Sequence, residues 1–296
     1  MKKELTVIVA IVSTTTAFGQ GTLIMPDSTN NRLVSFDAFD GSLVNSNLFG
    51  LAGGTPVHAM QVGSEIWVSE QIGDRVSRWS MTGTSLGAIT GGLDNIRGMG
   101  LIGNTVYVTN AGTANGAPGA ALVMYDTTGS ALGNFLTPGA PSPFGILSYQ
   151  GGMLVSSSSA NDDIHEYSLA GASLGTFHNS ASLSFVEQMD YAVNGEVLAA
   201  CFTTGGIARL DPTTGALLGS FGPASGLRGL KRLGNGNVLY SNASGAFVFN
   251  TVTGGSTQVY TGGGRYFDLL ADPVPEPASM AILGVGALAL LRRRRK

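Results

Sequence analysis

Six side chains that are able to hold a ligand fall at one position of a repeated sequence unit. Aligning the units places them directly before the first strand of each unit: His58, Arg97, Phe144, Glu187, Arg228 and, in the closing unit, Arg265 or Tyr266. Guanidinium groups bind carboxylates and phosphates through paired, charge-assisted hydrogen bonds. If the units form a ring, these side chains meet around its axis and predict a site for a carboxylate, a uronic acid or a phosphate. The alternative is a wet polar rim in which Arg and Glu pair only with one another.

Residues of known catalytic motifs are scarce in the chain. Of its three histidines, His165 and His178 fall in expected outer strands or turns, so a zinc site with several histidine ligands is not predicted. The pattern Gly-x-Ser-x-Gly occurs at 83–87 and 171–175, but there it belongs to the repeated turn-and-strand phrase and forms no nucleophile elbow. The single cysteine, Cys201, lies in an apolar run and is predicted to be a buried, unreactive thiol. The sequence therefore names no catalytic residue.

The elements that must position the six side chains are read from an internal repeat. A turn ending in glycine recurs, and its successive glycines are 39 to 46 residues apart: Gly41, Gly83, Gly129, Gly171, Gly215 and Gly254. A short alternating strand precedes each turn, and two further strand-like runs lie upstream of it. Glycine supplies the positive φ that a tight hairpin turn requires. Four short strands per unit of about 43 residues are typical of a β-propeller blade.

The repeat predicts an all-β fold, a six-bladed β-propeller with four-stranded blades. The first unit lacks its innermost strand, and the run 266–270 after the last unit is predicted to supply it and to close the ring. Closure removes the sheet edges that promote aggregation. A β-sandwich or an irregular solenoid is the structural alternative. No helical pattern of useful length is present between residues 20 and 272.

The repeat resembles YVTN- and NHL-type propellers. Residues 107–110 (YVTN) spell the motif of the first family, although in one unit only. Gluconolactonase-type propellers are also similar, and that resemblance implies a calcium ion near the axis, for which Glu70, Asn110 and Asp162 would be ligands. Their spacing forms no motif, so the sequence predicts no resident cofactor and leaves Ca²⁺ as an alternative.

The C-terminal segment has a different composition. Prolines on both sides of Glu276 keep the chain extended, an apolar run of 14 residues follows at 278–291, and the chain ends in cations. An apolar helix bordered by cations stays in a membrane with its basic end in the cytoplasm. The motif and the membrane-stop residues are Val274, Pro275, Glu276, Pro277 and Arg292, Arg293, Arg294, Arg295. This segment resembles a PEP-CTERM sorting tail, which implies processing by an exosortase in a Gram-negative bacterium that makes extracellular polysaccharide.

The N-terminus carries a second export signal. Met1, Lys2 and Lys3 form a basic start, an apolar run follows, and residues 17–19 (AFG) fit a cleavage site. The predicted organisation is a signal peptide at 1–19, a β-propeller at 20–272 and a sorting tail at 273–296. We expect export by the Sec machinery, a membrane-anchored intermediate with one transmembrane helix, and a final place at the cell surface or in the extracellular matrix.

The charge of the body excludes one class of partner. Between the two terminal segments, 9 Lys and Arg face 17 Asp and Glu, which gives a net charge of −8. A nucleic-acid-binding protein needs a basic stripe, so no nucleic-acid partner is predicted. Two function classes remain. The favoured class is a non-catalytic surface or matrix module that binds polysaccharide, protein or a small anion and is linked to exopolysaccharide or biofilm. The alternative is a secreted propeller hydrolase or lyase, similar to lactonases, with a metal at the central channel.

Overall fold

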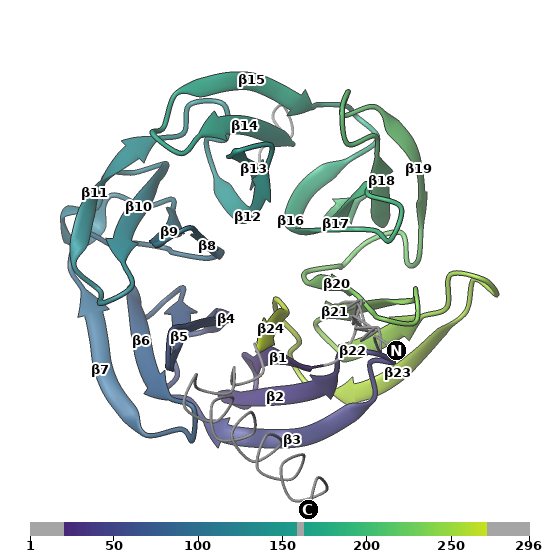
Figure 1. Cartoon of the computed structure of the whole chain (residues 1–296), viewed down its shortest axis with the longest axis horizontal. Helices are drawn as coiled ribbons and strands as arrows, with labels where there is room; N and C mark the ends of the chain where they lie inside the picture. Colours follow the sequence, from purple (N-terminus) through teal and green to yellow (C-terminus); the bar gives the residue numbers. More distant parts are fainter. Residues whose placement is uncertain (1–20, 159–162, 271–296) are drawn as a thin grey trace, which may run out of the picture.

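Six four-stranded antiparallel sheets form blades around a central axis, as Figure 1 shows. The computed structural model describes residues 21–158 and 163–270. Blade one consists of β24 (Asp268–Leu270), β1 (Thr22–Asp27), β2 (Arg32–Asp37) and β3 (Leu43–Gly50). Blade two consists of β4 (Pro56–Val62), β5 (Glu65–Glu70), β6 (Arg75–Ser80) and β7 (Ser85–Thr90). Blade three consists of β8 (Met99–Ile102), β9 (Thr105–Asn110), β10 (Ala121–Asp126) and β11 (Ala131–Leu136), with the short 3-10 helix η1 (Ala114–Gly116) after β9.

The second half of the ring repeats this plan. Blade four consists of β12 (Pro143–Tyr149), β13 (Gly152–Ser157), β14 (Ile164–Ser168) and β15 (Ser173–His178). Blade five consists of β16 (Ser184–Tyr191), β17 (Val197–Thr204), β18 (Ile207–Leu210) and β19 (Leu217–Phe221). Blade six consists of β20 (Leu230–Arg232), β21 (Val238–Asn242), β22 (Gly245–Phe249) and β23 (Ser256–Thr261).

The predicted six-bladed ring and its closure by the last strand are confirmed. β24 pairs antiparallel with β1, with Leu269 opposite Leu23, so the end of the chain completes the first blade. The strand begins at Asp268, two residues later than predicted. The residues before it contact the neighbouring blade, where the Tyr266 N–H donates to the Val57 carbonyl at 3.1 Å. The sandwich and solenoid alternatives are wrong.

Each junction between blades is filled by its own apolar cluster. Leu23 and Met25 of β1 pack toward blade six, whereas Ile24 packs toward blade two. Successive side chains of a strand point to opposite faces, so a sheet covered on both faces needs a nearly continuous apolar strand. All six clusters and the closing strand lie within residues 21–270, so this segment contains a complete folding unit.

One equivalent hydrogen bond joins the innermost strands at each of the six junctions, and the Thr109 hydroxyl adds a second bond to the Phe144 carbonyl at 3.1 Å. At three junctions a backbone N–H donates to a carbonyl of the next blade: Tyr266 to Val57, Gly98 to Phe144 and Gln188 to Arg228, at 2.9–3.2 Å. At the other three a serine hydroxyl donates: Ser69 to Arg97, Ser156 to Glu187 and Ser241 to Arg265. Each serine also accepts the N–H of its own inner strand.

Close approach at these links explains why glycine follows several of the predicted site residues. A Cβ on Gly98 would collide with the carbonyl oxygen of Phe144, and one on Gly145 would collide with that of Glu187. Glycine is therefore required so that neighbouring inner strands can touch.

Within residues 21–158 and 163–270, no helix has the length and apolar character to cross a membrane. The predicted signal peptide and the predicted C-terminal transmembrane helix lie outside the described residues.

Candidate ligand-binding site at the channel mouth

The carbonyls that accept the six links identify one equivalent position per blade, at one mouth of the central channel. We call these residues the mouth ring: Val57, Arg97, Phe144, Glu187, Arg228 and Arg265. Four of them coincide with the positions predicted from the sequence. In blade two the predicted residue, His58, lies one residue deeper, and in the closing unit the equivalent residue is Arg265. Tyr266 lies in the deeper layer beside His58, with ring centroids 5.6 Å apart.

The mouth ring is more buried than the wet polar rim that the sequence left as the alternative. Glu187 is 3% exposed, and Arg97 and Phe144 are each 7% exposed. Arg228 and Arg265 are half-buried. Val57, Phe144 and Tyr266 form a buried apolar cluster, and Phe185 packs against it. Charged groups at this depth interact much more strongly than they would on a surface.

Glu187 is the acidic member of the mouth ring. Burial raises the pKa of Glu187 to about 7, although Arg265, Arg228 and Arg97 act in the opposite direction. The Tyr266 hydroxyl also lowers this pKa, but it does not reach full hydrogen-bonding geometry, and Glu187 Oε2 has no hydrogen-bond partner among the described residues. We therefore regard Tyr266 as a weak polar neighbour. A carboxyl group with this pKa changes its charge near neutral pH.

The Arg97 side chain is held by the next blade. Its Nη1 donates to the Ser142 hydroxyl at 2.9 Å and to the Pro143 carbonyl at 3.2 Å. Its guanidinium carbon lies 3.8 Å from the centroid of the Phe144 ring. Burial lowers the pKa of Arg97, yet an arginine stays charged in proteins. This guanidinium is thus fixed in place before any ligand arrives.

Arg228 and Arg265 complete a cluster of three cations around one carboxyl group. Arg265 Nε donates to the Ser28 hydroxyl at 2.9 Å. The Nε atoms of Arg228 and Arg97 find no hydrogen-bond partner within the described part of the chain. Burial and the neighbouring Arg228 lower the pKa of Arg265. The mouth ring therefore has an excess of positive charge and donors that remain unused.

A continuous row of rings connects Arg97 with Arg228. Centroid distances are 4.6 Å from Phe144 to Phe185 and 5.0 Å from Phe185 to Phe202, and the Arg228 guanidinium carbon lies 5.7 Å from Phe202. Phe185 has φ = 60°, a left-handed conformation that a bulky side chain rarely adopts. Such strain costs about 1–3 kcal/mol and is found at binding sites. Neither Phe185 nor Phe202 was predicted, because their contacts cross between β16 and β17 at a β-bulge.

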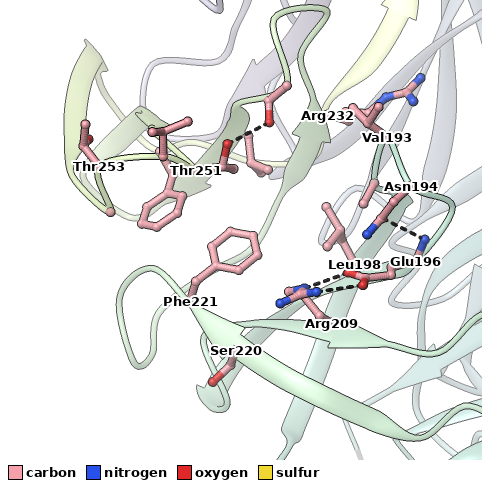
Figure 2. Close-up of a pocket in the computed structure, with 16 residues that line it drawn as sticks. Val193, Asn194, Glu196, Leu198, Arg209, Ser220, Phe221, Arg232, Thr251 and Thr253 are labelled. Atoms are coloured by element: carbon pink, nitrogen blue, oxygen red, sulfur yellow. Dashed lines mark hydrogen bonds and ion pairs between the residues drawn. The ribbon is translucent and has the colours of Figure 1, made fainter.

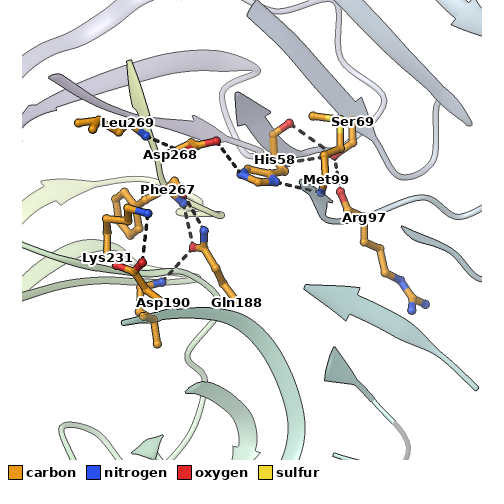
Figure 3. A network of polar contacts seen from close by, with 11 residues as sticks. His58, Ser69, Arg97, Met99, Gln188, Asp190, Lys231, Phe267, Asp268 and Leu269 are labelled. Atoms are coloured by element: carbon orange, nitrogen blue, oxygen red, sulfur yellow. Dashed lines mark hydrogen bonds and ion pairs between the residues drawn. The ribbon is translucent and has the colours of Figure 1, made fainter. Parts of the chain in front are cut away.

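His58 belongs to a different site, a channel cavity of about 320 Å³ below the mouth ring. Its Nδ1 accepts the Met99 N–H at 3.0 Å, and its Nε2 lies 3.7 Å from an Asp268 oxygen. Burial lowers the pKa of His58 even though Asp268 opposes it, which favours the neutral ring. Figure 3 shows the Arg97 guanidinium directed away from the His58 ring. The structure therefore does not bring His58 together with the arginines.

An ion pair in this lower cavity was not anticipated from the sequence. Lys231 Nζ lies 3.2 Å from Asp190 Oδ1 (Figure 3). Burial acts against the ammonium group, but Asp190 and Asp268 outweigh it and raise the pKa of Lys231. Asp190, Lys231 and Asp268 fall at one repeat position, three residues after the mouth-ring residue of their blade, so the repeat itself carried the signal.

The acids and amides considered as calcium ligands hold loops instead. Glu70 Oε2 accepts from Arg75 Nε at 2.6 Å, and the Asn110 amide donates to two loop carbonyls. Asp162 lies outside the described residues. In the segments 21–158 and 163–270, no three His, Cys, Asp or Glu side chains are placed to share a metal ion.

The remaining histidines and the cysteine lie where the sequence predicted. His165 is in β14 and His178 ends the outermost strand β15. Cys201 is fully buried, and burial raises the pKa of its thiol to about 12, which makes it unreactive.

The C-terminal segment carries a known sorting motif. Residues 273–296, which include the predicted motif and membrane-stop residues, match the PEP-CTERM protein-sorting motif. This motif implies an exported protein of a Gram-negative cell that passes through a membrane-anchored intermediate and is processed by an exosortase. The chain thus combines a PEP-CTERM sorting motif with a six-bladed β-propeller body.

Solved structures share the propeller, whereas a comparison with curated protein sequences found no match. A protein of unknown function from Bacteroides caccae is 15% identical, with a TM-score of 0.63 and coverage of 86% of this chain and 100% of that chain. A chain of a nidogen/laminin complex has a TM-score of 0.72 at 11% identity, covering 86% and 100%. Virginiamycin B lyase from Staphylococcus aureus has a TM-score of 0.58 at 11% identity, covering 88% and 87%. At these identities the similarity concerns the fold alone.

Proposed function

We propose that the propeller is a non-catalytic binding module whose mouth ring takes a carboxylate-bearing ligand, namely an acidic extracellular polysaccharide. One observation carries the proposal: three guanidinium groups, those of Arg97, Arg228 and Arg265, surround the single carboxyl group of Glu187. This excess of positive charge lies in a body whose net charge is −8. A protein that needed charge only for solubility would not concentrate its few cations at one buried mouth.

The proposed contacts follow from donors that are already in place. A uronate carboxylate would accept from the half-buried Arg228 and Arg265, because guanidinium and carboxylate pair in a bidentate geometry. The sugar ring would lie against Phe185 or Phe202. These two rings lie beside Arg228, whose guanidinium carbon is 5.7 Å from the Phe202 centroid. Protonation of Glu187 would remove the one negative charge that repels such a ligand.

Titration calorimetry with tri-galacturonate, on the segment 20–272, tests the proposal. We expect saturable binding that weakens as salt is added, and no binding of the uncharged maltotriose. Replacing Arg228 and Arg265 together by Gln should weaken binding by about 100-fold or more, because two charge-assisted contacts are lost. Arg78→Gln is the matched control, since Arg78 pairs with Glu65 in blade two. Equal binding of maltotriose, or an unaffected double variant, would contradict the proposal.

Sorting is proposed to run from a cleaved leader to a cleaved tail. The signal peptide 1–19 would be removed during Sec export, and the chain would be cut near Val274–Pro277 before it reaches the cell surface or the matrix. The match of residues 273–296 to the sorting motif supports this order. Intact-mass measurement of surface protein should find neither the leader nor Lys296. Surface protein that retains the full tail would refute the second cut.

A secreted lyase is the second candidate, and Glu187 is the observation that favours it. A carboxyl group whose pKa is about 7 is suited to proton abstraction next to a carboxylate that arginines stabilise. Incubation with polygalacturonate, with and without Ca²⁺, would then produce the ultraviolet absorbance of a new C=C bond. That absorbance must disappear in Glu187→Gln; if it is never seen, the lyase candidate is rejected.

A further inference from the structure

The propeller has two faces, and the direction of its strands tells them apart. Each inner strand runs away from the mouth ring, and neighbouring strands of a blade are antiparallel. The turns between the first and second strands of a blade, and between the third and fourth, therefore lie opposite the mouth. We call the surface formed by these turns the far face.

Exposed apolar side chains are concentrated on the far face. All but two of the large apolar side chains that are exposed in residues 21–158 and 163–270 lie toward it, the exceptions being Ile72 and Leu136. The turns contribute Phe39, Met81, Leu169, Val193 and Val252. The beginnings of the outer strands contribute Val44, Leu86, Leu132, Leu174 and Leu218. Single exposed apolar residues are common on soluble proteins, whereas a set gathered on one face marks an interaction surface.

These apolar positions surround the channel instead of forming one groove. Every blade contributes at least one of them. Val193 and Val252 are 67% and 91% exposed, because a cleft of about 740 Å³ separates their two turns. Figure 2 shows Val193 on one side of this cleft and Thr253 on the other. A contact that used all six blades at once would need a broad, flat partner.

The chain leaves the body on the far face. Leu270, the last residue that the structure describes, lies opposite Thr22 at the far end of β24, the innermost strand of blade one. The apolar run of the sorting segment begins eight residues later, at Ala278. An extended chain spans at most about 3.6 Å per residue, so this run begins within about 30 Å of Leu270. The headgroup layer on one side of a bilayer takes up about 5–8 Å of that length. While the run lies in a membrane, the far face is therefore the part of the body nearest the lipid.

We propose that, in the membrane-anchored intermediate, the far face rests on the outer surface of the bilayer through its apolar turns, with the mouth ring directed away from the lipid. Placing these side chains among the headgroups removes apolar surface from water, which drives the contact. The same turns carry Asp37, Asp40, Asp126 and Asp211, which anionic lipids repel. The far face thus fits a bilayer of zwitterionic lipid.

Docking of the far face depends on the anchored intermediate that the sorting motif implies, and is independent of the ligand proposed for the mouth ring. It adds an orientation: the mouth stays open to the outside while the tail is still attached. A mouth ring that fails to bind galacturonate would leave the docking face untouched, and the reverse also holds.

Quenching of site-specific fluorophores by lipid tests the proposal in the chain 20–296. The chain is inserted into phosphatidylcholine nanodiscs that contain a lipid with a nitroxide headgroup, and a bimane is attached at Leu169→Cys, Val252→Cys or Ile72→Cys. Cys201 stays unlabelled, because its thiol is buried and its pKa is raised to about 12. We expect a strong loss of fluorescence at the two far-face positions and none at Ile72, which is 76% exposed on the mouth side. Equal loss at all three positions, or a greater loss at Ile72, would overturn the proposal.

A second measurement separates docking from tethering. Phe39→Asp together with Val252→Asp leaves the tail intact and should remove most of the quenching at Leu169→Cys, whereas the matched pair Ile72→Asp and Leu136→Asp should leave it unchanged. Replacing phosphatidylcholine by phosphatidylglycerol should reduce the quenching, because the turn aspartates are repelled. Unchanged quenching in the far-face pair would mean that the tail alone positions the body, and this result or stronger quenching in phosphatidylglycerol overturns the proposal. Dimerisation of the segment 20–272 in light scattering, abolished by the far-face pair, would assign the far face to a second copy instead.

Discussion

Two buried carboxyl groups, Asp27 at the seam of the ring and Glu187 at the channel mouth, have opposite environments. Asp27 is fully buried and accepts from the N–H groups of Thr29, Asn30 and Gly263, the Asn30 amide and the Tyr260 hydroxyl, beside Arg32. These donors overcome burial and lower the pKa of Asp27. Glu187 has three arginines near it but an oxygen without a partner, and its pKa is raised to about 7. Burial alone therefore does not decide the charge of a carboxyl group; its donors do.

The two regions also differ in purpose. At the seam, donors from blade six meet a carboxylate from blade one, so the contacts hold the ends of the chain together. At the mouth, the charged groups are close but incompletely paired, and Phe185 is strained. Incomplete pairing of buried charge is destabilising, and folds retain it mainly where a ligand completes the set. The following predictions test this contrast, from the largest effect to the smallest.

Removing the closing strand should destroy the seam and the fold with it. A chain that ends at Gly264 loses β24 and exposes the inner edge of β1. We expect it to aggregate or to show no cooperative unfolding transition, whereas a chain that ends at Asp272 should unfold like the parent segment. Circular dichroism during heating makes the comparison. Equal melting of the two chains would mean that the seam is not needed for closure.

Asp27→Asn should destabilise the fold by about 3 kcal/mol, because a buried charge loses its ionic partner while the donors remain. The lowered pKa of Asp27 means that this stabilisation is present above its ordinary value of 3.8 and is lost as the pH falls through the folded-state value. Urea unfolding of both proteins at several pH values measures it. The difference between the variant and the parent should shrink in acid; a constant difference would show that the carboxylate charge is not responsible.

Glu187→Gln should change the free energy of unfolding in the opposite direction to Asp27→Asn. The pKa of Glu187 rises from an ordinary 4.5 to about 7, so its contribution to stability is full below 4.5 and is lost as the pH rises through 7. Removing the charge should therefore stabilise the fold by up to about 3 kcal/mol at pH 8 and have little effect at pH 4. The same urea series reports it. Destabilisation at pH 8 would mean that Glu187 is a structural partner of the arginines.

The affinity of the mouth ring for its ligand should depend on the protonation state of Glu187. In the parent protein, tri-galacturonate should bind about tenfold more tightly at pH 6 than at pH 8, because protonation removes a nearby like charge. Glu187→Gln should bind equally at both pH values. A pH dependence that persists in the variant would place the ligand away from Glu187.

Ser156→Ala removes one of the serine links. It should lower the free energy of unfolding by about 1–2 kcal/mol, because the buried Gly145 N–H loses its acceptor. Ser156→Thr keeps the hydroxyl and is the matched control, as Thr109 makes a similar contact in blade three. Urea unfolding provides the values. A loss that is equal in both variants would point to packing instead of the hydrogen bond.

The sequence predicted the ring well because blade formation is a local, repeated event. Period-two strands and turn glycines recur within each unit, so the number of blades and the closing strand were readable. Most of the mouth ring was readable for the same reason, since Arg97, Phe144, Glu187 and Arg228 fall at one position of the repeat. Arg97 and Arg228 lie two residues before β8 and β20, whereas Phe144 and Glu187 lie within β12 and β16.

The sequence predicted the contents of the mouth less well because these depend on contacts between units. The one-residue error at His58 arose at a β-bulge between Pro56 and His58, which no local pattern marks. Phe185 reaches the mouth through a positive φ, and Phe202 occupies a strand position that is polar in blades two and three. Burial of the charged ring is likewise a property of the closed channel, which periodicity within a unit cannot reveal.

The inner links show how freely blades can follow one another. Blades two, four and six donate a serine hydroxyl, blades one and five donate a backbone N–H, and blade three donates both the Gly98 N–H and the Thr109 hydroxyl to one carbonyl. Hydroxyl links therefore already stand side by side in blades two, three and four. Descendants or designs of this propeller should be able to gain or lose single blades without a mismatch at these links.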